Sequence, residues 1–465
     1  GVKGFDERVA ALLDTVRADV FPQHLAATVA EQVDGWLTSG QIPGLSPAGD
    51  ALVELVAAQF ANRQLDRRSD PAGAGVAVFT ATQQRAFDWL LAQQKDGVFS
   101  VNFGGQMYPD PSLTGFGLLA LQTKPRAMRS DGEQNVIESG LRWLLAQQRD
   151  DGTFGEDMAN YTTCVAVAAL SRWDDPAVAP AMQKAQKAIL AFQHLESTGF
   201  RRGDRDYGSI GYGDSQRGDL SNLHFSIGAL RATGLPADDE ALQKAIVFLQ
   251  RTQNLKSVND FKGRIPDPSN DSELVTAVSG NDGGATYYPG DSNAGYDVQP
   301  DGSVVARSYG SMTYALLKAY TLLGLSGSDP RVQAAVDWIR DHWSLETNPG
   351  ADPSLGEKAK YQGVFYGYMV LAQALAAAGI DELEVAQEGG AQKEVGQKAA
   401  AGDADAAAAT ARIDWRHALR QHLERTQQQD GTWVNDKNGR WMEDRPLLCT
   451  CYALVALELC NGHGR

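Results

Sequence analysis

A short motif that recurs after apolar helical stretches is the feature that most constrains the fold of this chain. It reads QQKDGVFS at Gln93–Ser100, QQRDDGTFG at Gln147–Gly155 and QQQDGTWVN at Gln427–Asn435. The aspartates of the first two copies, Asp96 and Asp151, lie 55 residues apart, which fits one repeated supersecondary unit rather than a pair of strands. The sequence therefore predicts a repeat architecture.

The motif marks a chain built from pairs of helical segments. The first segment of each pair is amphipathic, which is typical of a helix in an outer layer, and the second is apolar almost all round, which indicates a helix buried on every side. The six outer segments are Ala86–Gln94, Gly140–Gln148, Lys187–Leu195, Ala245–Gln253, Ala335–Trp343 and Leu419–Gln429. The six inner segments are Leu113–Gln122, Tyr161–Leu170, Asn222–Gly234, Ser311–Gly324, Phe365–Gly379 and Cys449–Gly462.

Alternating outer and inner helices close naturally into a double-walled ring, in which the motif turns the chain from an outer helix to its inner partner. Gly permits the sharp turn, Asp accepts backbone N–H groups, and the aromatic side chain packs between repeats. The Gln amide is expected to bind the end of the next helix. We therefore predict an all-α chain, an α/α toroid of six outer and six inner helices, whose motif is structural rather than catalytic.

The repeats resemble the QW-type repeats of prenyltransferases and squalene cyclases over about Ala81–Gly462, most specifically in QQQDGTW (427–433) and YALVALEL (452–459). RSYGSMTYA (307–315) and DWR (414–416) are similar to an uncharacterised bacterial subgroup. The resemblance implies the α/α toroid of the terpenoid cyclase and protein prenyltransferase superfamily, but no activity follows from it. Two family signatures are absent: no DxDD motif occurs, and Leu448 or Cys449 stands where the zinc-ligand His of the protein prenyltransferases falls.

Composition excludes several classes of function. The chain of 465 residues carries a net charge of −16, and nucleic-acid binding needs a basic face, so we expect no nucleic-acid partner. No apolar run approaches the roughly 20 residues of a membrane span, which predicts a soluble protein without a transmembrane segment. Because the chain begins with Gly1 rather than Met, a targeting segment could have been removed, and a cytoplasmic or an exported location remains open.

Three segments differ in composition from the repeats. Residues 1–78 have the pattern of amphipathic helices, which predicts an N-terminal extension that packs on the toroid of residues 79–465 or binds a protein partner. Residues 255–305 are rich in Gly, Asp, Asn and Pro, which predicts a long loop such as a lid. Residues 381–411 are biased toward Ala, Glu, Gln and Lys, which predicts a solvated, partly helical insertion.

The topology predicts where a ligand binds. Every inner helix begins after a motif turn or a long loop, so the six N-termini should face one mouth, where backbone N–H groups attract anions. The acidic candidates for catalysis there, each equally suited to be an N-cap, are Asp157, Asp219, Glu443 and Asp444. The candidates for substrate binding are Tyr161, His224, Arg307, Tyr309, Tyr314, Tyr361, Tyr366, Tyr368 and Trp441.

No cofactor is predicted. Cys164, His224 and Cys451 fall at equivalent positions of inner helices, but such positions face the ring axis from separate helices, which argues against zinc. We expect the barrel to bind an apolar isoprenoid or lipid, with turnover left open. The alternatives are a non-catalytic binding or scaffold protein and, third, a carbohydrate-active enzyme with two carboxylates across a groove.

Overall fold

The computed structural model describes residues 79–213, 217–386 and 410–461. By its internal contacts the chain divides into two units, and all described residues belong to the second, Ala72–Gly464. The predicted N-terminal extension, residues 1–78, lies outside the described residues, so its role stays a prediction. No helix in the described ranges combines the length and apolar character that a membrane span requires.

Twelve α-helices occur among the described residues, and each overlaps a predicted segment, although the outer helices begin four to nine residues before the predicted starts. The outer helices are α4 (Ala81–Gln93), α6 (Asp131–Ala146), α8 (Val178–Ala191), α10 (Glu240–Thr252), α12 (Pro330–Asp341) and α14 (Trp415–Thr426). The inner helices are α5 (Pro111–Leu121), α7 (Ala159–Leu170), α9 (Leu220–Ala232), α11 (Gly310–Leu322), α13 (Val364–Ala377) and α15 (Pro446–Cys460).

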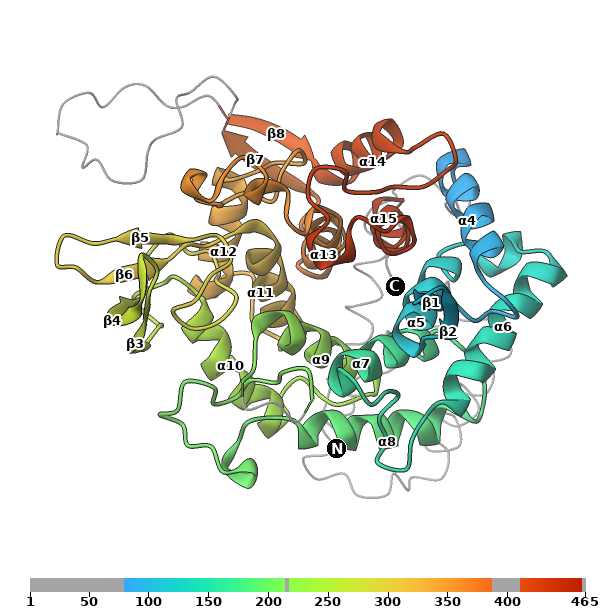
Figure 1. The fold of residues 1–465 in the computed structure, drawn as a ribbon, viewed down its shortest axis with the longest axis horizontal. Coiled ribbons are helices and arrows are strands. Elements are labelled where there is room, and N and C mark those ends of the chain that lie inside the picture. The colour runs from blue at the N-terminus through green and yellow to red at the C-terminus, as the bar shows by residue number, and fades with distance from the viewer. Residues whose placement is uncertain (1–78, 214–216, 387–409, 462–465) are drawn as a thin grey trace, which may run out of the picture. The chain divides into compact units, whose positions relative to one another are not determined.

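The inner helices form a closed cycle of contacts. The cycle runs from α5 through α7, α9, α11 and α13 to α15, which packs back on α5. The outer helices surround this cycle, and each packs on one or both of its flanking inner helices (Figure 1). Small residues let the inner helices approach closely: a Cβ on Gly115 of α5 would lie 2.7 Å from the side chain of Val165 of α7. The core therefore lies within and between the two layers of helices.

A glutamine at the end of the outer helix ties four of the repeats to the next one, although Gln93 of the first motif copy donates instead to the carbonyl of Trp89 in its own helix. The side-chain nitrogen of Gln148 donates to the carbonyl of Gly152 in its own turn (3.1 Å) and to that of Ala181 in the first turn of α8 (2.8 Å). Equivalent pairs of bonds are made by Gln193, Gln253 and Gln427. The bond of Gln427 reaches Thr82 of α4 at 2.8 Å, which joins the last repeat to the first.

The glycine and the aromatic residue of the motif also take the structural roles expected of them. Gly152 has a φ of +91°, and a Cβ there would lie 2.5 Å from the carbonyl oxygen of Lys184 in α8. Phe154 is buried, and its N–H donates to the hydroxyl of Thr163 in α7 at 3.1 Å. Three further turns donate to a threonine of the inner helix in the same way: Phe99 to Thr114, Ala285 to Thr313 and Trp433 to Thr450.

The prediction of an all-α chain is wrong in one respect, because the described residues also contain eight short strands. A hairpin of β1 (Ser100–Phe103) and β2 (Gln106–Pro109) lies between α4 and α5. The predicted loop 255–305 contains a mixed sheet in the order β3-β4-β6-β5. Its strands are β3 (Lys262–Asp267), β4 (Asn270–Val278), β5 (Tyr296–Val298) and β6 (Val304–Ala306), of which only β4 and β6 pair in parallel.

The predicted insertion 381–411 is bounded by strands rather than by helix. β7 (Glu382–Ala386) and β8 (Thr410–Asp414) pair antiparallel, and residues 387–409 between them lie outside the described residues. Leu383 and Val385 are buried while Glu382 and Glu384 are exposed, and this alternation is the period of a strand. Because β7 contacts α12 and β8 contacts α14, the hairpin lies at the junction of the last two repeats.

Candidate functional site

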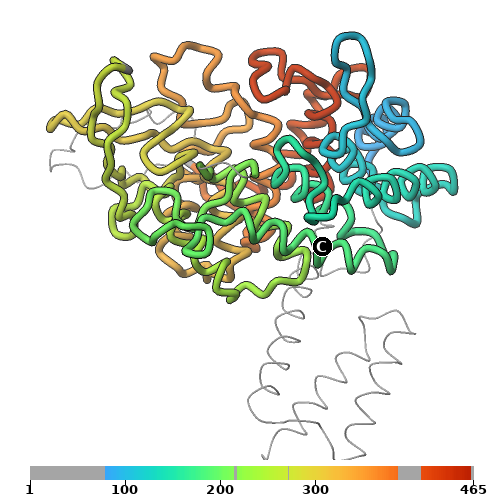
Figure 2. The backbone as a smooth tube through the Cα atoms, turned by 60° about the horizontal axis from the view of Figure 1, so that its bottom comes forward, coloured from blue at the N-terminus to red at the C-terminus, as the bar shows by residue number. Residues whose placement is uncertain are grey.

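A cavity of about 480 Å³ lies where the N-terminal ends of the six inner helices meet. Each inner helix contributes residues from its N-cap or its first turns, and the segments before α5, α9, α11, α13 and α15 supply the remainder of the wall. Figure 2 shows the β1–β2 hairpin and the loop before α15 projecting on the same side of the helices. The N-termini therefore lie around one mouth, at which the sequence predicts that a ligand binds.

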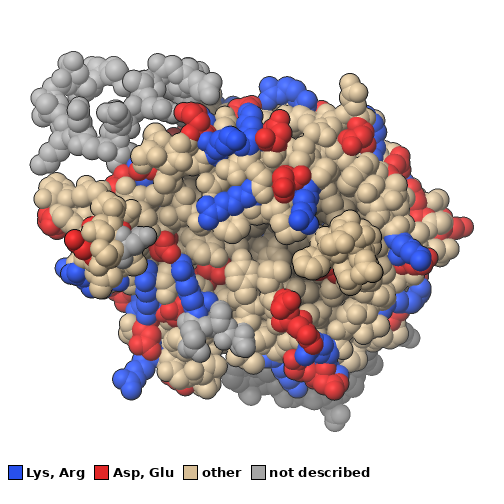
Figure 3. All heavy atoms as spheres, viewed as in Figure 1, with Lys and Arg blue, Asp and Glu red and all other residues tan. Residues whose placement is uncertain are grey.

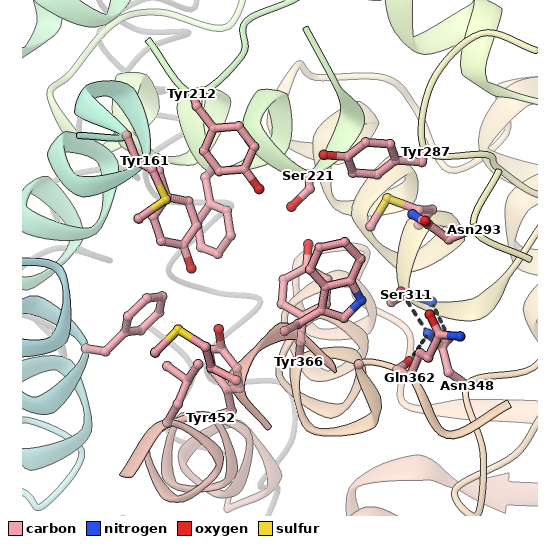
Figure 4. Close-up of a pocket in the computed structure, with 18 of the residues that line it drawn as sticks. Tyr161, Tyr212, Ser221, Tyr287, Asn293, Ser311, Asn348, Gln362, Tyr366 and Tyr452 are labelled. Carbon is pink, nitrogen blue, oxygen red and sulfur yellow. Dashed lines mark hydrogen bonds between the residues drawn. The ribbon is translucent and has the colours of Figure 1, made fainter. Parts of the chain in front are cut away.

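The wall of the cavity is rich in aromatic rings. Nine of its 26 residues carry aromatic rings, namely Phe116, Tyr161, Tyr212, Phe225, Tyr287, Tyr309, Tyr366, Trp441 and Tyr452. These rings pack edge to face across helix boundaries, with centroid distances of 5.3 Å for Phe116 and Tyr452 and 5.3 Å for Tyr161 and Phe225. The tyrosines that Figure 4 labels come from opposite sides of the opening and surround it.

The wall contains neither lysine nor arginine, and its single acidic residue is Asp110. Figure 3 shows the same face of the molecule hollowed near its centre, with charged side chains of both signs around the hollow. Asp110 is the N-cap of α5, and its carboxylate accepts from the N–H of Leu113 and from the hydroxyl of Ser112, both at 2.7 Å. An anionic ligand would therefore meet a carboxylate but no cation in the wall.

Side chains already cap four of the six helix N-termini at the mouth. Asp110 caps α5, and Asp219 caps α9 by accepting from the N–H of Asn222 at 2.8 Å. Asn348 accepts from the N–H of Ser311 at the start of α11 at 2.8 Å. Glu443 accepts from the N–H of Tyr366 in α13 at 2.8 Å. The N–H groups expected to attract an anion are thus occupied at these helices, three times by a carboxylate.

None of the four acidic candidates lines the cavity. Asp219 and Glu443 are buried caps, and burial raises the pKa of Asp219 to about 6 and that of Glu443 to about 7. The second oxygen of Glu443 accepts from the side chain of Asn435 at 2.8 Å. Asp157 and Asp444 are exposed on loops outside the wall. The structure therefore gives Asp219 and Glu443 the capping role that the sequence also allowed.

The candidates for substrate binding divide into two groups. Tyr161, Tyr309, Tyr366 and Trp441 line the cavity together. The other five lie outside the wall: His224, Arg307, Tyr314, Tyr361 and Tyr368. Arg307 pairs with Asp297, whereas the hydroxyl of Tyr368 lies 2.9 Å from the ring nitrogen of His422.

His224 does not line the cavity, but it contacts two residues of the wall, Phe225 with 4.4 Å between ring centroids and Tyr366. Its Nε2 lies 2.7 Å from the hydroxyl of Tyr366, and its Nδ1 is buried without a hydrogen-bond partner in the described structure. Complete burial holds the pKa of His224 well below its usual value, so the ring is neutral. When the neutral ring carries its proton on Nε2, it donates to the hydroxyl oxygen of Tyr366, and the unpaired Nδ1 is an acceptor only. The O–H group of Tyr366 then donates to a partner on the cavity side.

The backbone around the mouth adopts conformations that side chains rarely tolerate. Trp441 and Met442 have φ values of 65° and 64°, and Met158, the N-cap of α7, has 50°. Among the described residues only one other non-glycine residue, Asp96 in a motif turn, has a positive φ. Such strain gathers at functional sites, where surrounding contacts hold it in place. Three of the four positive-φ non-glycine residues of the described chain lie at the mouth, which favours a functional role for it.

Several residues of the wall had no recognisable signal in the sequence. Tyr212, Tyr287 and Asn293 come from irregular segments between helices, and only the folded chain brings them to the inner helices. Asp110 was recognisable in principle, because an Asp followed by Pro at the start of an apolar run is typical of an N-cap. The four cysteines are buried and free, and the described residues contain no group of three potential metal ligands.

No family model matches the chain, and no curated protein matches it. Among solved structures, a crystal structure of a protein from Actinoplanes is similar to the chain with a TM-score of 0.41 and 14% sequence identity. The similarity covers 82% of this chain and 98% of the other. So distant a likeness identifies neither a family nor an activity.

Proposed function

We propose that the described unit is an α/α toroid of the prenyltransferase and squalene-cyclase repeat type, and that its cavity binds an apolar isoprenoid or lipid. The observation that carries the binding proposal is the wall itself: nine aromatic rings, no lysine and no arginine around about 480 Å³. Ligand pockets of this size are typically apolar, with a few polar groups that orient the ligand. An extended hydrocarbon chain matches such a wall in size and polarity.

The charge of the mouth argues for an uncharged ligand over a prenyl diphosphate. A diphosphate needs cationic side chains or free helix N-termini, and the wall supplies no cation. Four of the six N-termini already hold side chains of the protein. Hydrolysis of a glycosidic bond is also disfavoured, because it uses a pair of carboxylates and only Asp110 lines the cavity.

The proposal concerns binding and leaves turnover open. Protonation of an alkene would need an acid that faces the ligand, and Asp219 and Glu443 direct their oxygens to helix N–H groups instead. The aromatic faces would stabilise a cationic intermediate, but they contact a neutral chain equally well. A scaffold role needs no cavity, so it becomes the favoured function if the cavity binds no apolar ligand.

Filling the cavity is expected to abolish binding. Ser221 lines the wall from the first turn of α9, and Ser221→Trp would place an indole in the ligand's space. We expect at least roughly ten-fold weaker binding of geranylgeraniol or squalene, measured by native mass spectrometry, because the ligand would lose the volume that it needs.

The matched control is Ser328→Trp, which adds the same side chain on an exposed segment between α11 and α12. This variant should bind like the wild type, and both variants should unfold at similar urea concentrations. Equal binding by the wild type and Ser221→Trp would contradict the assignment of the ligand to this cavity. No binding by the wild type to either compound would leave the scaffold role.

A further inference from the structure

Polar side chains gather on one side of the cavity, at the N-terminal ends of α11 and α13. Asn293, Ser311, Asn348 and Gln362 lie together there, whereas Tyr161 and Tyr452 lie on the other side (Figure 4). The cavity is thus amphipathic, with an aromatic part over α5, α7 and α15 and an amide-rich part at the opposite wall. A ligand that fills it would have an apolar body and one polar end.

Asn348 is the fixed frame of this polar part. Its side-chain oxygen accepts from the N–H of Ser311, and its nitrogen donates to the hydroxyl of Ser311 at 3.0 Å and to the backbone carbonyl of Gln362 at 2.9 Å. Both its N–H donors are therefore used within the protein, and its oxygen already accepts one hydrogen bond. Asn348 holds the start of α11 against the residue before the N-cap of α13, and it leaves recognition of a ligand to its neighbours.

Arg440 fixes which way the other two amides face. Its guanidinium donates to the side-chain oxygen of Gln362 at 2.9 Å and, at 3.4 Å, to that of Asn293. It also stacks on the ring of Trp441, with 4.5 Å between the guanidinium carbon and the ring centroid. Because a guanidinium only donates, the amide oxygens must face Arg440, and the NH₂ groups take the other side.

The two NH₂ groups have little to bind within the protein. That of Asn293 lies 3.5 Å from the hydroxyl of Tyr309, at the limit of a hydrogen bond, and that of Gln362 has no partner among the described residues. Both residues line the cavity, and the oxygen of each amide already accepts from Arg440. The two amides therefore offer uncharged NH₂ donors for which the protein supplies no good acceptor.

We propose that the amide groups of Gln362 and Asn293 bind a carbonyl oxygen of the ligand, so that the ligand class is an apolar isoprenoid or lipid that ends in a ketone or a quinone. This inference rests on the proposed function and names its ligand more closely. A carbonyl oxygen accepts two hydrogen bonds and donates none, which matches two NH₂ groups that only donate. A hydroxyl oxygen also accepts from these groups, but its own proton then needs a further acceptor.

Three ligands of equal chain length test the proposal: the isoprenoid methyl ketone farnesylacetone, its secondary alcohol and the hydrocarbon without oxygen. For the wild type we expect the ketone to bind about ten-fold more tightly than the hydrocarbon, the value of one or two net hydrogen bonds, with the alcohol between them. Native mass spectrometry measures the affinity and the stoichiometry of each ligand.

Substitutions distinguish the contribution of the amide hydrogen bonds to affinity from the contribution of the apolar wall. Gln362→Leu should lower ketone affinity toward that of the hydrocarbon while hydrocarbon affinity stays unchanged, because the leucine removes one of the two donors and keeps the volume. Arg440→Leu should remove most of the preference for the ketone, since both amides can then turn their oxygens inward. Gln333→Leu, on an exposed position of α12, should keep the full preference and serves as the control.

Different outcomes separate this inference from the proposed function. If the wild type binds all three ligands equally, or prefers the alcohol, the carbonyl assignment is overturned while the apolar cavity stands. Tighter binding of farnesyl diphosphate than of the ketone would overturn it as well. If none of the compounds binds, the proposed function itself fails, and the carbonyl assignment fails with it.

Discussion

Replacing Gly152 with alanine is expected to destabilise the fold by about 3 kcal/mol or more. Gly152 has a φ of +91°, where any other residue costs about 1–2 kcal/mol. A Cβ there would also lie 2.5 Å from the carbonyl oxygen and 2.9 Å from the carbonyl carbon of Lys184. Since these are backbone atoms of α8, the helix itself would have to move.

A second glycine of nearly the same conformation separates the two causes. Gly234, after α9, has a φ of +90°, and a Cβ there would have nothing within 4 Å. Gly234→Ala should therefore cost only the conformational part, about 1–2 kcal/mol. Urea unfolding followed by circular dichroism gives both values. Equal destabilisation by the two substitutions would show that the turn does not press on the next outer helix as described.

The second large effect is a gain of stability in mild acid that depends on Glu443. Burial raises the pKa of this carboxyl to about 7, above the 4.5 of an unperturbed glutamate. Between these two values the folded protein holds the proton more firmly than the unfolded chain. The resulting stabilisation is complete below about pH 4.5 and is lost as the pH rises through 7, and it amounts to on the order of 3 kcal/mol.

The free energy of unfolding, measured in urea at pH 5 and at pH 8, should therefore be higher at pH 5. Glu443→Gln removes the titrating group while it keeps a side-chain oxygen for the start of α13, so its difference between the two pH values should be much smaller. Asp219, whose pKa is raised to about 6, contributes with the same sign and remains in both proteins. Identical pH differences for the wild type and the variant would contradict the role of Glu443.

Much of the helical framework could be predicted because its signals are local. The amphipathic period of an outer segment such as Gly140–Gln148 and the nearly continuous apolar character of Cys449–Gly462 correspond to α6 and α15. The motif turn was also readable, because Asp followed by Gly is typical of a tight turn. Each of these features depends on neighbours in the sequence rather than on the distant packing of the chain.

The strands and the wall of the cavity depended on distant contacts and were missed. The loop 255–305 contains β-branched runs in β4 and β6, but its content of Gly, Asp and Pro masked them. Acidic residues near the mouth could be found by topology, yet whether Asp219 turns to a ligand or to a helix N–H is decided by the packing around it. The amides of Asn293 and Gln362 are oriented by Arg440, which follows Gln362 by 78 residues, so their role could not be predicted from local sequence.

The hydrogen bond from Gln427 to Thr82 closes the cycle of repeats and so fixes how many repeats it can contain. An open array of repeats can grow or shrink by one unit, because its ends are free and new repeats simply add to the stack. Here the turn of α14 must meet the first helix, and a Cβ on its Gly431 would lie 2.8 Å from the carbonyl oxygen of Arg85. Duplication or deletion of a single repeat would separate these partners, so change in this protein is expected to come through its loops and not through its repeat number.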